Sequence, residues 1–388
     1  VLFIGMAIYS MGVAESELVE SGVEGAQAFY LAEAGLERAV VWLNEHAEKS
    51  SYPSEASVEG EALGPGTYSV KLRNTGSADP WFTRYEVVSV GAVDGVRRQI
   101  SAEIRMESFA QYLYFTNNMP WNVRFTTKDR LDGPVHSNGW LRINGDPLFG
   151  DAVSTTKHKL HMTWWSEPTF EKGVDLNAEK VEYPGGGNLA KSYAKMAKEN
   201  GLYGGKLKGG KAYYEVEFGR NGITGYMSYR TYQKVGKKYQ WSGWSDIAIE
   251  DTGGLIWAEE PIEIKGVLDG RVTIGSDEDI YITDDIVYAG AGFEGLGPGP
   301  ECDDLLGIIS KKDIVVANTP PNRDNCEIHG ALMALGRSFE AENAFWGPPR
   351  GNLTVHGSII QKKSGRVCMF EIAGWIIHGY KRDYHFDQ

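Results

Sequence analysis

The stretch "QAFYLAEAGLERAV", residues 27–40, follows an apolar opening, "VLFIGMAIYSMGVA", residues 1–14, with no proline between them. In the first stretch apolar side chains recur every three or four positions, as at Phe29, Ala32 and Leu36. This spacing places them on one face of an α-helix, and charged residues fall on the other side. The sequence therefore predicts one continuous helix from the start of the chain through both stretches.

The predicted helix has a clear end and an unusual glycine content. It stops near residue 48, because serines and Pro53 follow. At 1.5 Å per residue it would be about 70 Å long. Each internal glycine weakens a helix by about 1 kcal/mol relative to alanine, but it also allows close approach of a neighbouring backbone. We therefore expect the helix to pack among other helices. The glycines are Gly5, Gly12, Gly22, Gly25 and Gly35.

The composition bounds the remainder of the chain. The 388 residues include 39 Lys+Arg and 52 Asp+Glu, and the formal net charge of -13 argues against nucleic acid as the main partner. The chain is long enough for two or more domains. It contains 48 glycines, and 12% of its residues are aromatic. Together with many short apolar runs, this predicts a mainly β fold with tight turns after the N-terminal helix.

The N-terminal motif "AFYLAEAGLERA", behind an apolar opening, resembles the first helix of type IV pilin-like proteins, specifically the PilX-like minor pilins. The resemblance covers about a tenth of the chain. It implies that a leader is removed, that the apolar half first inserts in the inner membrane, and that it later packs in a filament core. The sequence opens on Val1 without a Met or a basic n-region, so we expect a processed or truncated end. Pilins of this kind carry a glutamate at the fifth mature position, whereas position 5 here is glycine and the first acid is Glu15.

Two β-rich segments are expected after the helix, which itself occupies residues 1–50. Residues 51–107 alternate apolar and polar side chains around an Asp94-Gly95 turn, which predicts a small antiparallel β unit. Residues 108–388 repeat short apolar strands separated by Gly or Asp turns. That rhythm favours a β-solenoid similar to a parallel β-helix, with a β-sandwich as the alternative. The terminal "AGWIIHGYKRDYHFD" resembles an uncharacterised domain found behind PilX-like N termini, which implies architecture and location only.

Residues 165–250 interrupt this rhythm and are predicted to form an insertion. They contain a Lys-rich helical segment and then "GYMSYRTYQKVGKKYQWSGWSD", which is dense in tyrosine and tryptophan. Such a surface is typical of a subunit contact or of a glycan-binding face. The alternative is a solvated hairpin with a small core of its own. The candidate contact residues are Tyr226, Tyr232, Trp241 and Trp244.

The three cysteines are interpreted from their surroundings. Cys302 and Cys326 lie in polar loops rich in Pro, Gly and Asn, and a bridge between them would close a modest loop, as in proteins of oxidising compartments. We expect this disulfide, with two thiols as the alternative. Cys368 is expected to be a buried, inert strand residue.

The acidic run "GSDEDIYITDD" offers a candidate calcium site at Asp277, Asp279 and Asp284, because hard cations need several converging oxygens. The alternative is that these acids cap turns and keep the surface soluble. No EF-hand spacing is present. His136, His158 and His161 lack the flanking motifs of a catalytic or metal centre and are expected to be ordinary surface or core histidines. No other cofactor is expected.

These observations favour a structural protein rather than an enzyme. The leading hypothesis is a subunit of an extracellular pilus-like filament, in which copies of the chain, and other pilins, bury the helix and display the β-rich region outside. A minor pilin or tip adhesin that binds surfaces or glycans is the alternative, and an anchored β-helix enzyme acting on polysaccharides is a further one. The residues expected in the filament core are Leu2, Phe3, Ile4, Ile8, Phe29, Leu31 and Leu36.

Overall fold

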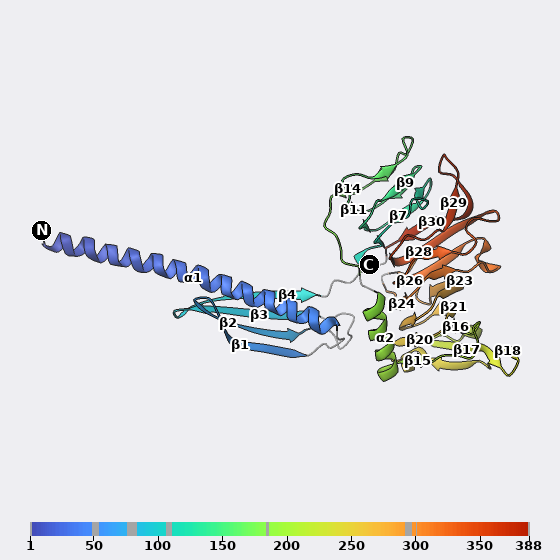
Figure 1. Ribbon diagram of the computed structural model, residues 1–388, viewed down its shortest axis with the longest axis horizontal. Coiled ribbons are helices and arrows are strands. Elements are labelled where there is room, and N and C mark those ends of the chain that lie inside the picture. Colours follow the sequence, from blue (N-terminus) through green and yellow to red (C-terminus); the bar gives the residue numbers. More distant parts are fainter. Residues whose placement is uncertain are drawn as a thin grey trace. The chain divides into compact units, whose positions relative to one another are not determined.

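A computed structural model describes residues 2–48, 54–75, 84–105, 111–183, 186–291, 297–299 and 301–386. Within these ranges, the side chains of residues 2–5, 7, 8, 10, 17, 46–48, 105 and 186–188 are not described. The chain divides into two compact units, Val1–Ser108 and Phe109–Gln388. The protein is mainly β, with one long helix at its N-terminus (Figure 1).

The first unit is a long helix on a four-stranded antiparallel sheet. Helix α1 (Leu2–Glu48) confirms the predicted helix. The sheet has the order β1-β2-β3-β4, in which the last three strands confirm the predicted antiparallel pattern and β1 was not predicted. The turn between β3 and β4 contains Asp94 and Gly95, both with positive φ. The strands are β1 (Glu55–Leu63), β2 (Gly66–Asn74), β3 (Arg84–Val93) and β4 (Val96–Arg105).

Small residues allow α1 to lie close against this sheet. Ala28 and Ala32 are fully buried at the contact. A Cβ added to Gly35 would come within 2.3 Å of Ser89 Oγ, and one added to Gly91 would come within 2.0 Å of the Ala28 carbonyl oxygen. The glycine that lowers helix propensity at position 35 is thus required by the packing of the helix on its own sheet.

Most strands of the second unit pair in parallel, each with strands from other parts of the chain (Figure 1). The longest ladder runs from β15 to β14, and each of its strands pairs with the next. In order of pairing, the strands are β15 (Leu202–Gly204), β20 (Leu255–Ala258), β22 (Arg271–Ser276), β24 (Leu305–Ser310), β26 (Cys326–Ala334), β28 (Pro349–Gln361), β5 (Tyr114–Thr116), β8 (Val135–Ser137), β11 (Val153–Thr155) and β14 (Val174–Leu176).

Three further parallel ladders accompany the first. The second ladder contains β16 (Tyr213–Phe218), β21 (Ile262–Leu268), β23 (Ile280–Tyr288), β25 (Ile314–Val316) and β27 (Phe339–Ala341). The third joins β23, β26 and β28 to β30 (Ile376–His385), β7 (Arg130–Asp132), β10 (Leu148–Phe149) and β13 (Thr169–Phe170). The fourth contains β6 (Phe125–Thr126), β9 (Arg142–Asn144) and β12 (His161–Met162).

The ladders stack like side chains into continuous apolar columns. In the first ladder Ile274, Ile308 and Leu332 occupy equivalent positions of successive strands, and each is at most 1% exposed. The column continues through Ile359 of β28 to Tyr114 of β5. The first strands of the unit therefore stack beyond its late strand β28, so the core joins segments far apart in the sequence.

The predicted insertion at residues 165–250 has a different extent in the structure. Residues 169–176 belong to the parallel ladders, because β13 pairs with β10 and β14 pairs with β11. The Lys-rich segment forms helix α2 (Gly186–Asn200), as predicted, and its Tyr193 ring stacks on Trp257 with centroids 6.1 Å apart. The segment that leaves the ladders is an antiparallel excursion of β17 (Tyr226–Val235), β18 (Lys238–Trp241) and β19 (Ser245–Ala248).

Shorter elements accompany the ladders. Strand β29 (Cys368–Phe370) pairs antiparallel with β30. The 3₁₀ turns among the described residues of this unit include η3 (Arg220–Gly222), η4 (Ile249–Thr252) and η5 (Pro321–Arg323).

The predicted disulfide between Cys302 and Cys326 is not formed, and this expectation is corrected. Both residues are thiols. The Cys302 thiol donates to Asp304 Oδ2 at 3.5 Å, whereas Cys326 begins β26 and is fully buried in the core. Burial raises the pKa of the Cys326 thiol, which disfavours the reactive thiolate. Cys368 is buried in β29, as predicted, and burial raises its pKa to about 11.

Candidate functional site

The first candidate surface is the N-terminal half of α1, where the helix extends past the strands of its sheet (Figure 1). Its apolar side chains are open to solvent, including Tyr9 at 76%, Met11 at 72% and Leu18 at 74% exposed. A lone apolar side chain at a surface is ordinary, but a series of them along one helix marks an interaction surface. We call this the uncovered helix surface, and its described members are Met6, Tyr9, Met11, Val13, Leu18, Val19 and Val23.

The structure divides the residues predicted for a filament core. Phe29 is 43% exposed and remains available to a partner. Leu31 is 6% exposed and packs in the core between α1 and the sheet, and Leu36 packs against the same core. The prediction for Leu31 is therefore corrected, because its apolar contacts lie within the subunit. Leu36 is only partly buried, and its place in a filament core stays a prediction. The side chains of Leu2, Phe3, Ile4 and Ile8 lie outside the described residues.

Across the described part of the chain, no helix combines the length and apolar character that crossing a membrane requires.

The second candidate surface is the aromatic excursion. Tyr232 of β17 pairs with Trp241 of β18, and their ring centroids are 5.1 Å apart. The guanidinium of Arg230 lies 3.8 Å from the Trp241 centroid and 4.4 Å from that of Trp244. These cation–π contacts cover part of the rings and stiffen the hairpin.

Tyr226 is the first residue of β17 and lies opposite Ala248 of β19. The structure therefore brings Tyr232, Trp241 and Trp244 together around Arg230, while Tyr226 pairs elsewhere. Tyr226 and Trp241 remain 46% and 37% exposed, respectively.

An acidic groove of about 490 Å³ adjoins this hairpin through β16. Glu215 of β16 stands between Arg230 of β17 and Glu263 of β21 in the strand register. Arg230 donates to the Glu215 carboxylate at 2.6 Å, and Lys265 lies 3.8 Å from it. The other groove residues include Tyr281, Thr283, Asp284, Asn318 and Glu342.

Glu263 is the acid of this groove with the most perturbed ionisation. Its partial burial, followed by repulsion from Glu215, raises its pKa to about 7. Sequence patterns did not reveal this pair, because Glu215 and Glu263 are far apart in the chain. Only the parallel register of β16 and β21 makes them neighbours.

We expect Glu263→Gln to stabilise the protein at alkaline pH. The folded-state pKa of about 7 lies above the ordinary 4.5, so ionisation of Glu263 opposes folding, and stability is lost as the pH rises from about 4.5 to about 7. Because this side chain is only partly buried and solvent screens the repulsion, we expect a gain of only about 1 kcal/mol in the free energy of unfolding at pH 8. Urea titrations at pH 4 and pH 8 measure it.

The gain should be absent at pH 4, where the wild-type carboxyl is protonated. The same replacement at the exposed Glu250 should change the stability at neither pH. A Glu263→Gln protein that is less stable than the wild type at pH 8 would contradict the predicted direction.

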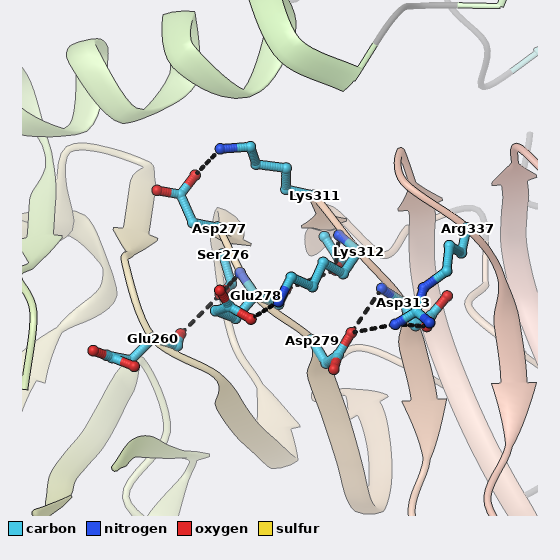
Figure 2. A network of polar contacts seen from close by, with 10 residues as sticks. Glu260, Ser276, Asp277, Glu278, Asp279, Lys311, Lys312, Asp313 and Arg337 are labelled. Atoms are coloured by element: carbon cyan, nitrogen blue, oxygen red, sulfur yellow. Dashed lines mark hydrogen bonds and ion pairs between the residues drawn. The ribbon is translucent and has the colours of Figure 1, made fainter. Parts of the chain in front are cut away.

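Two of the acids predicted for calcium, Asp277 and Asp279, have separate partners at the turn that follows β22 (Figure 2). Asp277 accepts from Lys311 Nζ at 3.3 Å, and Glu278 pairs with Lys312. Asp279 accepts from the backbone N–H of Asp313 at 3.0 Å.

The register of these turns explains the pairing, because Ser276 of β22 stands opposite Ser310 of β24. The run "SDED" therefore lies against the run "SKKD" of the next chain turn. Asp284, in β23, accepts from the backbone N–H of Asp285. The three predicted ligands are thus engaged at different points, and a calcium site there stays a prediction.

Of the three histidines named from the sequence, His136 is buried, whereas His158 and His161 are exposed. His136 is buried, with Nδ1 2.8 Å from Ser154 Oγ and Nε2 3.0 Å from Asn138 Oδ1. Burial lowers its pKa. The rings of His158 and His161 both stand edge-on to Trp140.

A family model described as "Domain of unknown function (DUF4900)" matches residues 67–157, less than half of the chain. No curated protein matches. Among solved structures, the competence-associated pilin ComZ from Thermus thermophilus is similar, with 12% identity and a TM-score of 0.30, over 94% of this chain and 97% of that one. A likeness of this size does not establish a shared fold.

Proposed function

We propose that this chain is a structural, non-enzymatic subunit of an extracellular type IV pilus-like filament that polymerises through α1. The uncovered helix surface carries this proposal. The sheet of the subunit leaves Leu18 and its apolar neighbours exposed. Burial of such side chains stabilises an assembly by about 25 cal/mol per Å² of apolar surface. Copies of the same helix offer a complementary apolar surface, and a repeated head-to-tail contact builds an open filament.

The glycines of α1 support packing between helices. Near Gly12 and Gly22, no described atom beyond the chain neighbours and the adjacent backbone of α1 lies within 4 Å of the position that a Cβ would take. These glycines therefore do not serve packing inside the subunit, in contrast to Gly35. Close approach of a neighbouring helix is the use that remains for them. Before assembly, the apolar half would be inserted in the inner membrane, and other pilins are further partners.

We also propose that the second unit is a β-solenoid displayed on the outside of the filament. Its parallel ladders and stacked apolar columns favour this architecture over a β-sandwich, which is built from antiparallel sheets. For example, Thr273 of β22 pairs in parallel with Leu255 of β20 on one side and with Gly307 of β24 on the other.

Microscopy of native filaments tests the assembly proposal. Surface filaments would be purified, negatively stained and labelled with antibodies against the second unit. Labels at regular intervals along the fibres are expected for a polymerising subunit. The proposal is contradicted if the full-length chain is absent from fibres and is monodisperse without detergent.

A tip adhesin is a second candidate, because the aromatic excursion presents Trp241 and Tyr226 to solvent beside an acidic groove. Labels restricted to fibre ends would favour it.

If the hairpin binds glycans, Trp241→Ala should weaken binding on a glycan array by about tenfold or more, because the ring supplies the contact area. The exposed Trp346 is a matched control, since Trp346→Ala removes the same side chain from another surface. Equal loss in both variants would contradict a site on the hairpin.

A further inference from the structure

A cluster of two histidines and one glutamate lies on neighbouring parallel strands of the second unit. Glu327 and His329 are two positions apart in β26, so both side chains leave the strand on the same side. His356 of β28 stands directly opposite His329 in the register. The parallel pairing of β26 and β28 therefore brings His356 beside two side chains of a strand that lies well before it in the sequence.

The ligand atoms of this cluster converge. His329 Nε2 is 2.9 Å from Glu327 Oε1, and His356 Nε2 is 3.8 Å from the same oxygen. The three ligand atoms all lie within 4.8 Å of one another. Ligands of a tetrahedral zinc ion, at about 2.0–2.1 Å from the metal, are about 3.3 Å apart. Small side-chain movements would therefore complete a coordination shell.

His356 supplies the observation that points to a ligand. It is only 6% exposed, yet its Nε2 has no hydrogen-bond partner among the described residues. A buried polar atom without a partner costs about 1–3 kcal/mol, so such atoms are rare unless something binds them. This nitrogen lies on the side of the ring that faces Glu327.

The surroundings enclose the cluster and orient its rings. The ring centroid of His329 is 5.2 Å from that of Tyr288, and the ring centroid of His356 is 5.0 Å from that of His385. The backbone at Gly297 passes so close to His356 that an added Cβ would lie 2.4 Å from Nδ1. The imidazole of His356 is thus held in place.

We propose that Glu327, His329 and His356 bind one divalent transition-metal ion, which joins β26 to β28. Two imidazole nitrogens and one carboxylate oxygen are ligands that zinc and its neighbours in the first transition row accept, whereas calcium and magnesium prefer oxygen alone.

Binding requires a change of tautomer at His329. The backbone N–H of Tyr288 donates to His329 Nδ1 at 3.1 Å, so Nε2 carries the ring proton and donates it to Glu327. When the metal binds, the N–H bond at Nε2 breaks, a metal–nitrogen bond forms there, and Nδ1 takes up a proton from solvent. The ring stays a neutral imidazole, and the Tyr288 amide gives up its hydrogen bond to Nδ1.

Metal titration of the full-length chain tests this site, with zinc and cobalt as the probes. After chelator treatment and dialysis, calorimetry should show one zinc ion bound per chain. Cobalt should give the visible absorption of a low-symmetry site with nitrogen ligands. At 100 times the dissociation constant, zinc should raise the melting temperature by about 5 °C.

Three replacements by glutamine separate the site from surface binding. Glu327→Gln and His356→Gln should each weaken zinc binding by about 100-fold or more, because each removes a ligand. His158→Gln, at an exposed histidine, should leave it unchanged. Thermal melting without metal checks that each variant folds. If His356→Gln does not fold, Glu327→Gln alone tests the site. A wild-type chain that binds no zinc, or binding retained by Glu327→Gln, overturns the proposal.

Discussion

Replacing Leu18 with lysine should abolish filament assembly while leaving each subunit folded. Leu18 is 74% exposed on α1, so its replacement removes little from the core of the first unit. In a filament, the same side chain would lose its buried contact, worth about 2 kcal/mol, which alone raises the critical concentration about 30-fold. Burial of the lysine charge adds several kcal/mol more. Sedimentation and negative-stain microscopy of assembly mixtures measure the result.

The conservative replacement Leu18→Met is the matched control and should assemble almost normally, because it keeps the apolar volume. Circular dichroism melting should give similar transition temperatures for the wild type and both variants. Normal fibres from Leu18→Lys would show that this surface does not mediate assembly, and unfolding of that variant would show that Leu18 serves the subunit's own core.

Removal of Asp129 should produce the largest loss of stability in the second unit. Its carboxylate is fully buried, with Oδ2 2.6 Å from Arg382 Nη1 and Oδ1 3.1 Å from the Arg382 backbone nitrogen. It also accepts from the backbone N–H of Thr126 at 2.8 Å. This network ties β30 to β6 and β7, which come from the opposite end of the unit's sequence. Asp129→Ala leaves the Arg382 charge buried without its counterion and should cost about 3–5 kcal/mol in the free energy of unfolding.

Urea denaturation measures this cost. Asp151→Ala is the control, because Asp151 also pairs with a basic residue, Lys172 at 2.9 Å, but Asp151 is only partly buried and Lys172 is exposed. That pair should contribute less than about 1 kcal/mol. The double variant Asp129→Asn/Arg382→Met removes the charges together and should recover part of the loss. Equal effects of Asp129→Ala and Asp151→Ala would contradict the importance given to burial.

Local periodicity was sufficient to predict α1, α2 and the strands β2 to β4. In these elements each side chain's environment depends on neighbours within a few positions, as at Ala28 and Ala32 on one helix face. Periodicity could not assign Leu31 and Leu36 to a partner. A spacing of three or four shows that an apolar face exists, but not whether a sheet of the same subunit or another helix covers it.

The polar sites were beyond prediction for a related reason. By composition alone, the acids at 277–279 suit a cation site, and the lysines at 311 and 312 suit a solvated turn. The register of β22 and β24 pairs them with each other instead. Likewise, the loops around Cys302 and Cys326 were compatible with a disulfide, but β26 carries Cys326 into the core.

The sequence by itself determined the long helix, its apolar opening and the mainly β character of the remainder, since these follow from local propensity and pattern. Only the tertiary structure decided which apolar residues of α1 stay uncovered, that Glu215 lies beside Glu263, and that His356 faces Glu327. The physical reason is that parallel pairing joins residues at a register set by whole chain turns, including their loops. No local rule of hydrophobicity or spacing specifies that register.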